Sequence, residues 1–427
     1  MCERIRLQSH PYVEGGCDTL FLPMGVSAES RKQGLYQLQH RGQDACGIAT
    51  TEFLGPYHCI KGKGLVSEVF DSNLIGTNLI GYMGLGHVRY RTSGTIRDLE
   101  AQPISSHGTH DIFLVHNGHV SESAGKREFQ HQRSDSYIIL SSKIFLALHQ
   151  VYLKCSGSFS CLIMFNAKFV VGFRDSHGIK PLILGQRRNH DSSHDYMLAS
   201  KTVALEKLDY VPMRDISPRE AVLIDVTANN QLEFHQVVNL KSYLLDIFEL
   251  VYFARPESTL DGINVKDCRR RIGCALGSMV LETLGAVTCG KIDVVIPVPD
   301  SGYKRLKTVW RKLSTVSSGF QAKNVLIVDD SIVRGGTSRE IVRIVRKAGV
   351  IQVVFASSSP AIRYNHIHGI DLAEPEALIA HGRTESEVAQ TIGADKVVYL
   401  PLDMLLACCL ASRAQLSKVY GFEVGFF

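Results

Sequence analysis

The sequence lacks any apolar run long enough to cross a membrane. A bilayer span needs about 20 consecutive apolar residues, and the most apolar late stretch, YLPLDMLLACCLA, is shorter and contains Asp403. The start carries Arg4 and Arg6 but continues with polar residues, where a secretory signal would have an apolar core. We therefore expect a cytoplasmic protein with no membrane segment.

A cysteine framework and a nucleic-acid-binding stripe are also missing. The 11 cysteines form no CxxC pair and show no regular spacing, which argues against a disulfide scaffold and for reduced thiols. The net charge of +5 is spread along the chain without interleaved aromatic residues, so we expect no nucleic acid partner. Such a charge suits small anionic ligands.

What the first half does contain is glycine and many apolar runs of strand length. LIGYMGLGHVRY, DIFLVHNGHV, CLIMFNAKFVVGFRD, YMLASKTVAL and EAVLIDV are each bounded by Gly, Asp, Asn or Pro, the residues that end strands in packed β-structure. This half is predicted to be largely antiparallel sheet with a few helices.

The pattern changes near residue 241. CRRRIGCALGSMVLETLGAV and SREIVRIVRKAG have helical periodicity, whereas DVVIPVPD, NVLIVDD and QVVFASSSP read as strands. Strands that alternate with helices predict a parallel sheet, which binds ligands at the carboxyl ends of its strands. The length suits two domains, and we place them at residues 1–240 and 241–427.

One loop of the second half combines two kinds of ligand-binding group. In VLIVDDSIVRGGTS, residues 325–338, Asp329 and Asp330 end a strand. Thr337 or Ser338 is expected to cap the following helix, with Glu340 in its first turn. Helix N-termini attract phosphate, whereas the carboxylates suit sugar hydroxyls or a divalent metal. The plainer alternative is a strand-to-helix turn with a solvated Asp pair; a Walker loop is excluded because GxxxxGK[ST] is absent.

This loop and nine further segments, in the same order, resemble the amidophosphoribosyltransferase family, also named glutamine phosphoribosylpyrophosphate amidotransferases, and most of all its fungal-like branch. The nine segments are LQHRGQDACGIAT (38–50), GLGHVRYRTSG (84–94), AQPI (101–104), HNG (116–118), SDS (134–136), FRDSHGIKPLILG (173–185), FELVYFARPESTLDGINV (248–265), VIPVPDS (295–301) and ASSSPAIRYNHIHGIDL (356–372). The resemblance implies an α+β N-terminal-nucleophile hydrolase domain, an αββα sandwich of the type 2 glutamine amidotransferases. An α/β type I phosphoribosyltransferase domain would follow it.

The activity that this resemblance implies is the first step of de novo purine synthesis. Ammonia from glutamine would displace pyrophosphate from phosphoribosyl pyrophosphate, giving 5-phosphoribosylamine and glutamate, in a homo-oligomer. Two alternatives are an impaired paralogue that binds phosphoribosyl or purine nucleotides as a regulator or partner, and a glutaminase whose ammonia goes elsewhere.

The resemblance also assigns a glutamine site. Arg89 would pair with the α-carboxylate of glutamine and Asp135 with its α-ammonium. Asn117 and the N–H of Gly118 would form the oxyanion hole. Each has a plainer interpretation when taken alone: an Arg on a surface strand, an Asp that caps a helix, and an Asn-Gly hairpin turn.

The nucleophile departs from the family pattern, a cysteine at the mature N-terminus whose own α-amine is the general base. Removal of the first methionine would expose Cys2, whereas Cys17 needs cleavage after the residue before it but has the usual spacing to His40 and a more strand-like sequence behind it. Both stay open, with Cys17 favoured. A third possibility is that neither works, because Glu3 and Asp18 replace the usual glycine and an anion there would raise the thiol pKa.

In the second half, the resemblance implies a Mg²⁺ site and a phosphoribosyl site. Mg²⁺ would lie at Ser301, Asp329 and Asp330. The phosphoribosyl group would contact Asp329, Asp330, Ser331, Gly335, Gly336, Thr337 and Ser338.

Two departures concern the rest of this half. Only GYKRLKTVWRKLSTVSSGFQAKN separates the PVPDS and VDDS segments, where the family has a helix, a strand and a basic closing loop. Lys304, Arg305 and Lys307 offer charge in its place, and either a paralogue that lost the segment or a sequence with a piece missing would explain the shortening. Asp246 replaces a cysteine of iron–sulfur members, so we expect no iron–sulfur cluster.

Overall fold

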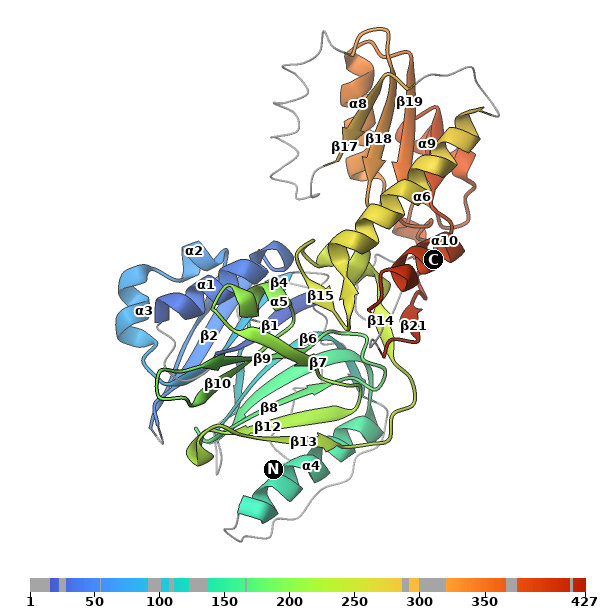
Figure 1. The fold of residues 1–427 in the computed structure, drawn as a ribbon. Helices are drawn as coiled ribbons and strands as arrows, with labels where there is room; N and C mark the ends of the chain where they lie inside the picture. Colours follow the sequence, from blue (N-terminus) through green and yellow to red (C-terminus); the bar gives the residue numbers. More distant parts are fainter. Residues whose placement is uncertain are drawn as a thin grey trace.

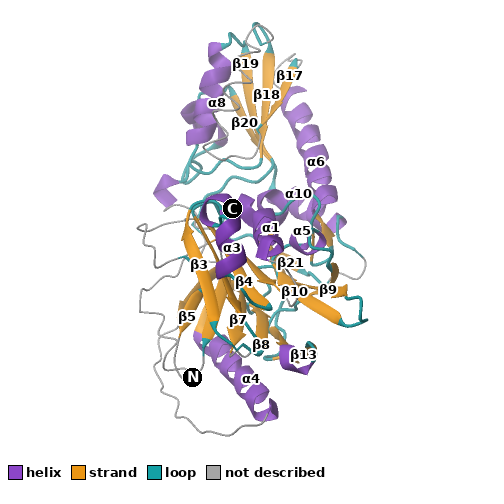
Figure 2. Ribbon diagram, turned by 90° about the vertical axis from the view of Figure 1, so that its left-hand side faces the viewer, coloured by secondary structure: helices purple, strands orange, loops and turns teal. Residues whose placement is uncertain are grey.

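The computed structural model of the chain has a lower body built on two stacked sheets and an upper body with a smaller sheet, linked by a long helix (Figure 1). Figure 2 shows the same two bodies after a quarter turn. The structure describes residues 16–22, 28–53, 55–90, 101–106, 111–122, 137–165, 167–285, 292–298, 320–365, 375–414 and 418–427.

The first sheet of the lower body has seven antiparallel strands. Their order is β11 (Val211–Asp215), β9 (Ile183–Arg188), β10 (His194–Ala199), β1 (Gly16–Leu22), β4 (Met83–Tyr90), β2 (Ala45–Thr51) and β3 (Tyr57–Lys63). All seven residues of β2 are buried, because helices cover one face of this sheet and the second sheet covers the other.

The second sheet has six antiparallel strands. Their order is β13 (Gln231–Gln236), β12 (Glu220–Asp225), β8 (Phe169–Arg174), β7 (Cys155–Phe165), β6 (Ile112–Glu122) and β5 (Ile104–Ser106). The inner faces of the two sheets share one core, in which Leu85 and Leu198 of the first sheet join Val115 and Leu162 of the second. Full burial of one such side chain contributes about 1.5–3 kcal/mol.

Helices lie outside both sheets (Figure 1). Those on the seven-stranded sheet are α1 (Ala28–Leu38), α2 (Val66–Val69), α3 (Ser72–Asn78) and α5 (Thr202–Glu206). The six-stranded sheet is covered by α4 (Tyr137–Lys154), whose Phe145 and Leu148 pack in a core with Phe173 and Leu223. The lower body is thus the αββα sandwich that the resemblance predicts.

The upper body is built on a four-stranded parallel sheet. Its order is β17 (Val294–Pro297), β18 (Asn324–Asp329), β19 (Gln352–Ser357) and β20 (Lys396–Tyr399). The α-helices in the part of this half that the structure describes are α6 (Val265–Gly285), α8 (Gly336–Lys347), α9 (Glu385–Ile392) and α10 (Leu402–Ala411). The parallel sheet that alternation of strands and helices predicted is confirmed.

Alternate residues of these strands point to opposite faces, and a different helix covers each face. Leu326 and Val354 belong to the core that contains Leu276 of α6. Their neighbours Val325 and Val353 belong to the core that includes the apolar residues of α8 and α9. Burial on both faces is why these strands read as unbroken apolar runs.

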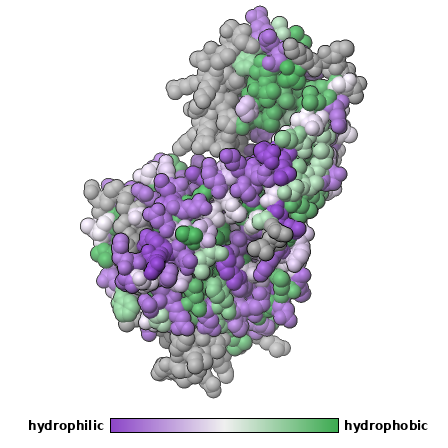
Figure 3. Space-filling model, in the orientation of Figure 1, coloured by the Kyte–Doolittle hydropathy of each residue, from purple (hydrophilic) through white to green (hydrophobic). Residues whose placement is uncertain are grey.

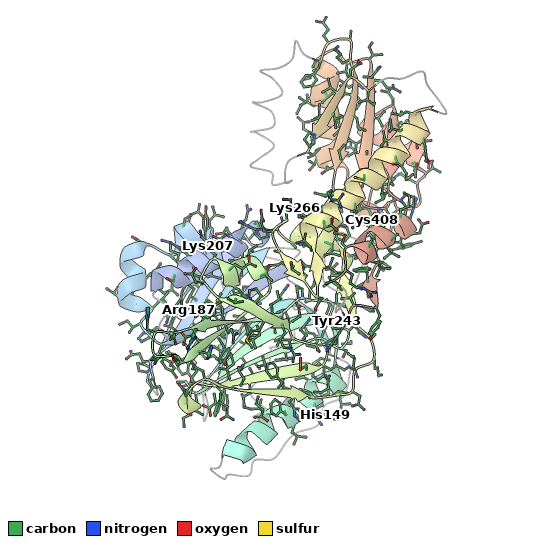
Figure 4. The ribbon with its side chains drawn as sticks, viewed as in Figure 1. His149, Arg187, Lys207, Tyr243, Lys266 and Cys408 are labelled. Atoms are coloured by element: carbon green, nitrogen blue, oxygen red, sulfur yellow. The ribbon has the colours of Figure 1, made fainter. Side chains whose placement is uncertain are left out.

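A segment between the two bodies joins them. Its strand β14 (Leu244–Asp246) pairs in parallel with β21 (Gly421–Glu423), and the hairpin of β15 (Thr259–Leu260) and β16 (Ile263–Asn264) leads into α6. Three buried ion pairs tie this segment to the sandwich: Arg174–Asp261, Lys180–Asp246 and Lys201–Glu249. Tyr243 lies at this junction (Figure 4) and donates to the Asp261 carboxylate at 2.5 Å.

The surface differs between the two bodies. In the view of Figure 3 hydrophilic residues dominate the sandwich, whereas apolar residues gather on the upper body and along α6. Val295 of the edge strand β17 is 57% exposed and Leu281 of α6 is 71% exposed. Among the described residues, no helix combines the length and apolarity that a membrane crossing requires.

Candidate functional site

The glutamine-site candidates of the sandwich lie on neighbouring strands. Cys17 of β1 is directly opposite Arg89 of β4 in the antiparallel register. Arg89 is also opposite Ala45 of β2, on the other side of β4, and its side chain is half-buried. The Cα atoms of directly opposed residues lie about 4.5–5.5 Å apart, so the chain fold brings the backbone of the favoured cysteine next to the predicted carboxylate-binding arginine.

Asn117 and Gly118 lie inside a strand, in β6, where they oppose Ser160 and Phe159 of β7. The hairpin-turn alternative for this pair is therefore wrong. Gly118 has φ +112°, and an added Cβ would lie 2.1 Å from the Ser158 carbonyl oxygen. Only glycine fits there, because that φ is unfavourable for L side chains and the carbonyl leaves no room. The β1 strand packs against β6 of the other sheet, so this glycine lies on a strand that faces the cysteine strand across the sandwich.

A buried polar network holds the strand that carries Asn117. Gln102 accepts from the His116 backbone N–H through Oε1 at 2.8 Å, and its Nε2 lies 3.0 Å from His116 Nδ1. The amide Nε2 is a donor, so His116 Nδ1 accepts. His87 Nε2 lies 3.2 Å from the His116 carbonyl oxygen and must donate to it.

Burial and the neighbouring His116 ring keep the pKa of His87 well below its ordinary value, because a charged imidazole would lose its hydration. Both histidines are almost fully buried. Sequence reasoning missed Gln102, His87 and His116, although all three lie in segments that carry the family resemblance.

Three of the predicted site residues, Cys2, Asp135 and Ser301, lie outside the described residues. The choice between Cys2 and Cys17 as nucleophile therefore stays open. Ammonium binding by Asp135 and metal binding by Ser301 stay predictions.

The phosphoribosyl candidates lie at the carboxyl edge of the parallel sheet. Asp329 is the last residue of β18, and its Oδ1 accepts from the Asp330 N–H at 2.9 Å. The Ser331 hydroxyl donates to Asp330 Oδ1 at 2.7 Å. The carbonyl oxygens of Asp329 and Asp330 accept from Ser358 and Ser359 of the neighbouring connection, each at 2.9 Å. These hydrogen bonds thus fix the backbone of both Asp329 and Asp330 to the connection that follows β19.

The predicted helix cap is wrong. Helix α8 begins at Gly336, and its N-cap is Gly335, with φ +71° and no side-chain cap bond. Thr337 and Ser338 therefore lie in the first helical turn, and Glu340 lies beyond it. The reason is that Gly335 adopts the left-handed conformation, which turns the chain into the helix two or three residues earlier than the predicted hydroxyl cap would.

The corrected start still leaves the first-turn N–H groups at the loop, because a helix cannot pair them internally. Gly336 is exposed and Thr337 half-exposed, whereas Ser338 is buried. Below them the loop is anchored by Ile332, which is 1% exposed, and by the Val333 carbonyl, which accepts from Ile379 at 2.9 Å. This arrangement offers backbone donors to an anion without mobile side chains.

The electrostatics of the carboxylate pair favour a cation. Burial, and then the charge of Asp330, raise the pKa of Asp329 to about 8. Within the described part of the chain, no group of three or more His, Cys, Asp or Glu side chains is arranged to hold a metal. Two carboxylates are nevertheless a donor set that fits Mg²⁺, which commonly takes one or two carboxylates and completes its shell with ligand phosphate and water.

Asp246, on which we based the expectation of no iron–sulfur cluster, is buried. Asp246 is 1% exposed and accepts from Lys180 Nζ at 2.8 Å and from the Phe248 N–H at 3.0 Å. Its role in this structure is an ion pair with the sandwich. Sequence reasoning missed this contact because its two partners lie 66 positions apart.

Comparisons with known proteins cover most of the chain. A family model for a glutamine amidotransferase domain matches residues 87–207. The amidophosphoribosyltransferase of Saccharomyces cerevisiae is 39% identical over 92% of this chain and 87% of its own length. That of Escherichia coli is 35% identical over 93% of this chain and 89% of its own.

Two solved structures have the same fold. The structure of the allosteric regulatory enzyme of purine biosynthesis has a TM-score of 0.75 and 27% identity, covering 92% of this chain and 91% of that one. The glutamine phosphoribosylpyrophosphate amidotransferase of B. subtilis, complexed with ADP and GMP, has a TM-score of 0.74 and 26% identity over 94% of each chain.

The alignments also agree with a shortened chain. The alignment to the S. cerevisiae protein spans 453 positions, whereas 92% of 427 residues is about 393, so about 60 positions hold no residue of this chain. With this identity along nearly the whole length of both proteins, the chain belongs to the amidophosphoribosyltransferase family.

Proposed function

We propose that the chain uses glutamine, water and phosphoribosyl pyrophosphate to make 5-phosphoribosylamine, glutamate and pyrophosphate. The observation that carries the proposal is the presence of two sites in one chain of this family. Cys17 is in register with Arg89 beside the Gly118 strand, and a carboxylate pair leads into the N-terminus of α8. The first suits amide hydrolysis and the second suits a sugar phosphate.

In the sandwich, the thiol of Cys17 would attack the amide carbon of glutamine, with the cysteine's own α-amine as the base. Arg89 would pair with the substrate α-carboxylate, and Asp135 would hold the α-ammonium. The Gly118 N–H and Asn117 would stabilise the oxyanion, whose charge develops only in the transition state. Ammonia would leave, and water would release glutamate from the thioester.

In the upper body, the first-turn N–H groups of α8 and the loop at Gly335 would bind the 5′-phosphate. Asp330 and the Ser331 hydroxyl would accept and donate at the ribose hydroxyls. Bound Mg²⁺, held by Asp329, Asp330 and Ser301, would offset the negative charge of the pyrophosphate. Ammonia would then form the new bond to the sugar carbon that pyrophosphate leaves.

Several finer points belong to the same proposal. We propose the division into residues 1–240 and 241–427; the end of β13 at Gln236 and the start of β14 at Leu244 support it. Assembly with further copies of this chain and a cytoplasmic location are proposed from the family resemblance.

The direct test is to incubate the purified protein with labelled glutamine, phosphoribosyl pyrophosphate and Mg²⁺ and to measure glutamate and pyrophosphate separately. The proposal predicts both products. Glutamate release should depend on phosphoribosyl pyrophosphate, and pyrophosphate release should depend on glutamine. Glutamate without pyrophosphate would instead support a glutaminase. Neither product, together with thermal stabilisation by phosphoribosyl pyrophosphate, would support a regulatory paralogue.

The nucleophile is tested by sequencing the N-terminus of the mature chain. A first residue of Cys17 is expected. A chain that begins at Cys2 would transfer the role to that cysteine, and an intact Met1 would exclude both and overturn the amide-hydrolysis half of the proposal.

A further inference from the structure

The Lys180 side chain connects the predicted oxyanion hole to the segment between the two bodies. Lys180 is fully buried, and its ammonium donates to Asp246 Oδ2 at 2.8 Å. Near the other end of the same side chain, Lys180 Cγ lies 3.1 Å from the position that a Cβ on Gly118 would take. The aliphatic stem of this lysine therefore packs directly against the Gly118 backbone.

The backbone of Lys180 is fixed as firmly as its ammonium. The buried Asp175 carboxylate accepts from the Lys180 N–H at 3.1 Å and from the Phe159 N–H at 3.2 Å through Oδ2. Phe159 is the residue opposite Gly118 in the β6–β7 register. One carboxylate thus ties the lysine to the strand that pairs with Gly118, so the stem has a fixed position under that peptide.

The anchor at the far end belongs to the segment between the bodies. Asp246 Oδ1 accepts from the Phe248 N–H at 3.0 Å, and the Asp246 N–H donates to the Ile179 carbonyl at 3.2 Å. Because both charges of the Lys180–Asp246 pair are at most 1% exposed, separating them would leave an uncompensated buried charge. The position of the ammonium is therefore tied to the β14 strand, which holds Asp246.

We propose that Lys180 is a positioning residue for glutamine hydrolysis, which fixes the Gly118 peptide in the orientation that stabilises the oxyanion and takes its own position from Asp246. This inference rests on the proposed function of the sandwich. Gly118 has no side chain through which neighbours could hold it, and its φ of +112° lies outside the ordinary strand region. The pairing with β7 holds the strand at Gly118, and the packed Lys180 stem adds a restraint on the direction of the Gly118 N–H. A donor misplaced from the oxyanion loses stabilisation mainly in the transition state.

The chain offers a matched control. Lys201 and Glu249 form another fully buried ion pair between the sandwich and the same segment. Of the three heavy atoms nearest to an added Cβ on Gly118, one belongs to Lys180 and none to Lys201. A variant at Lys201 therefore disturbs a comparable buried charge without removing the support of the predicted oxyanion hole.

The experiment compares wild type, Lys180→Met, Lys201→Met and the double variant Lys180→Met/Asp246→Leu in glutamine hydrolysis. Lys180→Met is expected to lower kcat about 10- to 100-fold while KM for glutamine changes by less than about twofold. Affinity for glutamate γ-semialdehyde, which forms a tetrahedral adduct with a thiol, should fall in parallel with kcat. Lys201→Met should keep the wild-type kcat in its folded fraction.

The double variant separates positioning from folding. Replacing both members of a buried ion pair by apolar residues commonly restores stability, so this variant is expected to recover the wild-type Tm and still to show the low kcat. Lys180→Arg, which keeps the charge, should recover part of the rate.

Two results would overturn the inference alone: a kcat in the double variant that returns to wild type together with the Tm, or equal losses of kcat in Lys180→Met and Lys201→Met. Wild-type protein that hydrolyses no glutamine would overturn the proposed function of the sandwich and this inference with it.

Discussion

Alanine substitutions at Gly335 and at its neighbour Gly336 test the geometry of the predicted phosphate-binding loop. Gly335 has φ +71°, and an added Cβ would lie 2.2 Å from Ile379 Cδ1. Gly336 has no such φ, and nothing lies within 4 Å of its added Cβ. The same one-carbon change is therefore strained at one position and unopposed at the next.

The magnitude follows from two terms at Gly335. An alanine in the left-handed region costs about 1–2 kcal/mol. Ile379, which is 4% exposed, must also leave its packed rotamer, at a cost of about 0.5–1.5 kcal/mol. Gly335→Ala should then lose about 1.5–3.5 kcal/mol of unfolding free energy. Gly336→Ala should gain about 0.4–1 kcal/mol, because alanine restricts the unfolded chain and favours helix.

The assay is urea unfolding of both variants, followed by thermal shift with phosphoribosyl pyrophosphate and Mg²⁺. Gly335→Ala should lose most of the ligand-induced rise in Tm, since relief of the strain moves the backbone N–H groups of the loop. Equal stability of the two variants, or an unchanged ligand shift in Gly335→Ala, would refute the assigned loop geometry.

Three further predictions address the carboxylates, the buried histidine and the arginine. Asp329→Asn should raise the Tm of the ligand-free protein, because it removes one of two adjacent carboxylates at a buried site. It should also abolish the Tm shift that Mg²⁺ with phosphoribosyl pyrophosphate produces, and a surviving shift would contradict the assignment of Asp329 to this site. His87 has a depressed pKa in the folded state, so below pH 6.5 only the unfolded chain takes up its proton. Wild type should then lose up to about 1.4 kcal/mol of stability per pH unit from this group as the pH falls towards 5.5, and His87→Gln should remove that slope in urea unfolding; identical slopes would contradict the neutral buried assignment. Arg89→Lys should raise KM for glutamine at least about tenfold with a smaller change in kcat, because lysine cannot form the bidentate pair with a carboxylate; an unchanged KM measured by glutamate release would remove Arg89 from the site.

The sequence predicts best those elements whose burial follows a single period. In α6 the buried residues recur every three or four positions, from Val265 and Cys268 through Ile272 to Leu284, so its helix is legible without any partner. The strand NVLIVDD is equally clear, because both of its faces are covered and the run ends at Asp329.

Predictions fail where local conformation or distant contacts decide. YMLASKTVAL, predicted as one strand, ends in α5 (Thr202–Glu206), since β10 stops at Ala199. The prediction of a helix cap at Thr337 or Ser338 was wrong because the helix begins after Gly335. The positive φ of Gly335 depends on the folded turn and cannot be predicted from the local sequence. The anchoring of Lys180 by Asp246 depends on a pairing of remote segments that periodicity cannot report.

The glutamine site shows both limits at once. Arg89 and Gly118 could be proposed from segments that resemble the family, and the strand register then places Arg89 opposite Cys17. The hydrogen-bond network could not be predicted, because it joins residues far apart in the sequence: Gln102, His116 and His87. Nothing in the sequence distinguishes these side chains from other polar residues.

The central claim, that one chain hydrolyses glutamine and delivers its nitrogen to a sugar phosphate, is tested most directly by isotope transfer. The protein is supplied with glutamine labelled with ¹⁵N at the amide, phosphoribosyl pyrophosphate, Mg²⁺ and an excess of unlabelled ammonium. The phosphoribosylamine formed is trapped, and its ¹⁵N content is measured by mass spectrometry. We predict one labelled product per glutamate released, despite the ammonium in solution. Glutamate release with unlabelled product, or with no product, would contradict the claim.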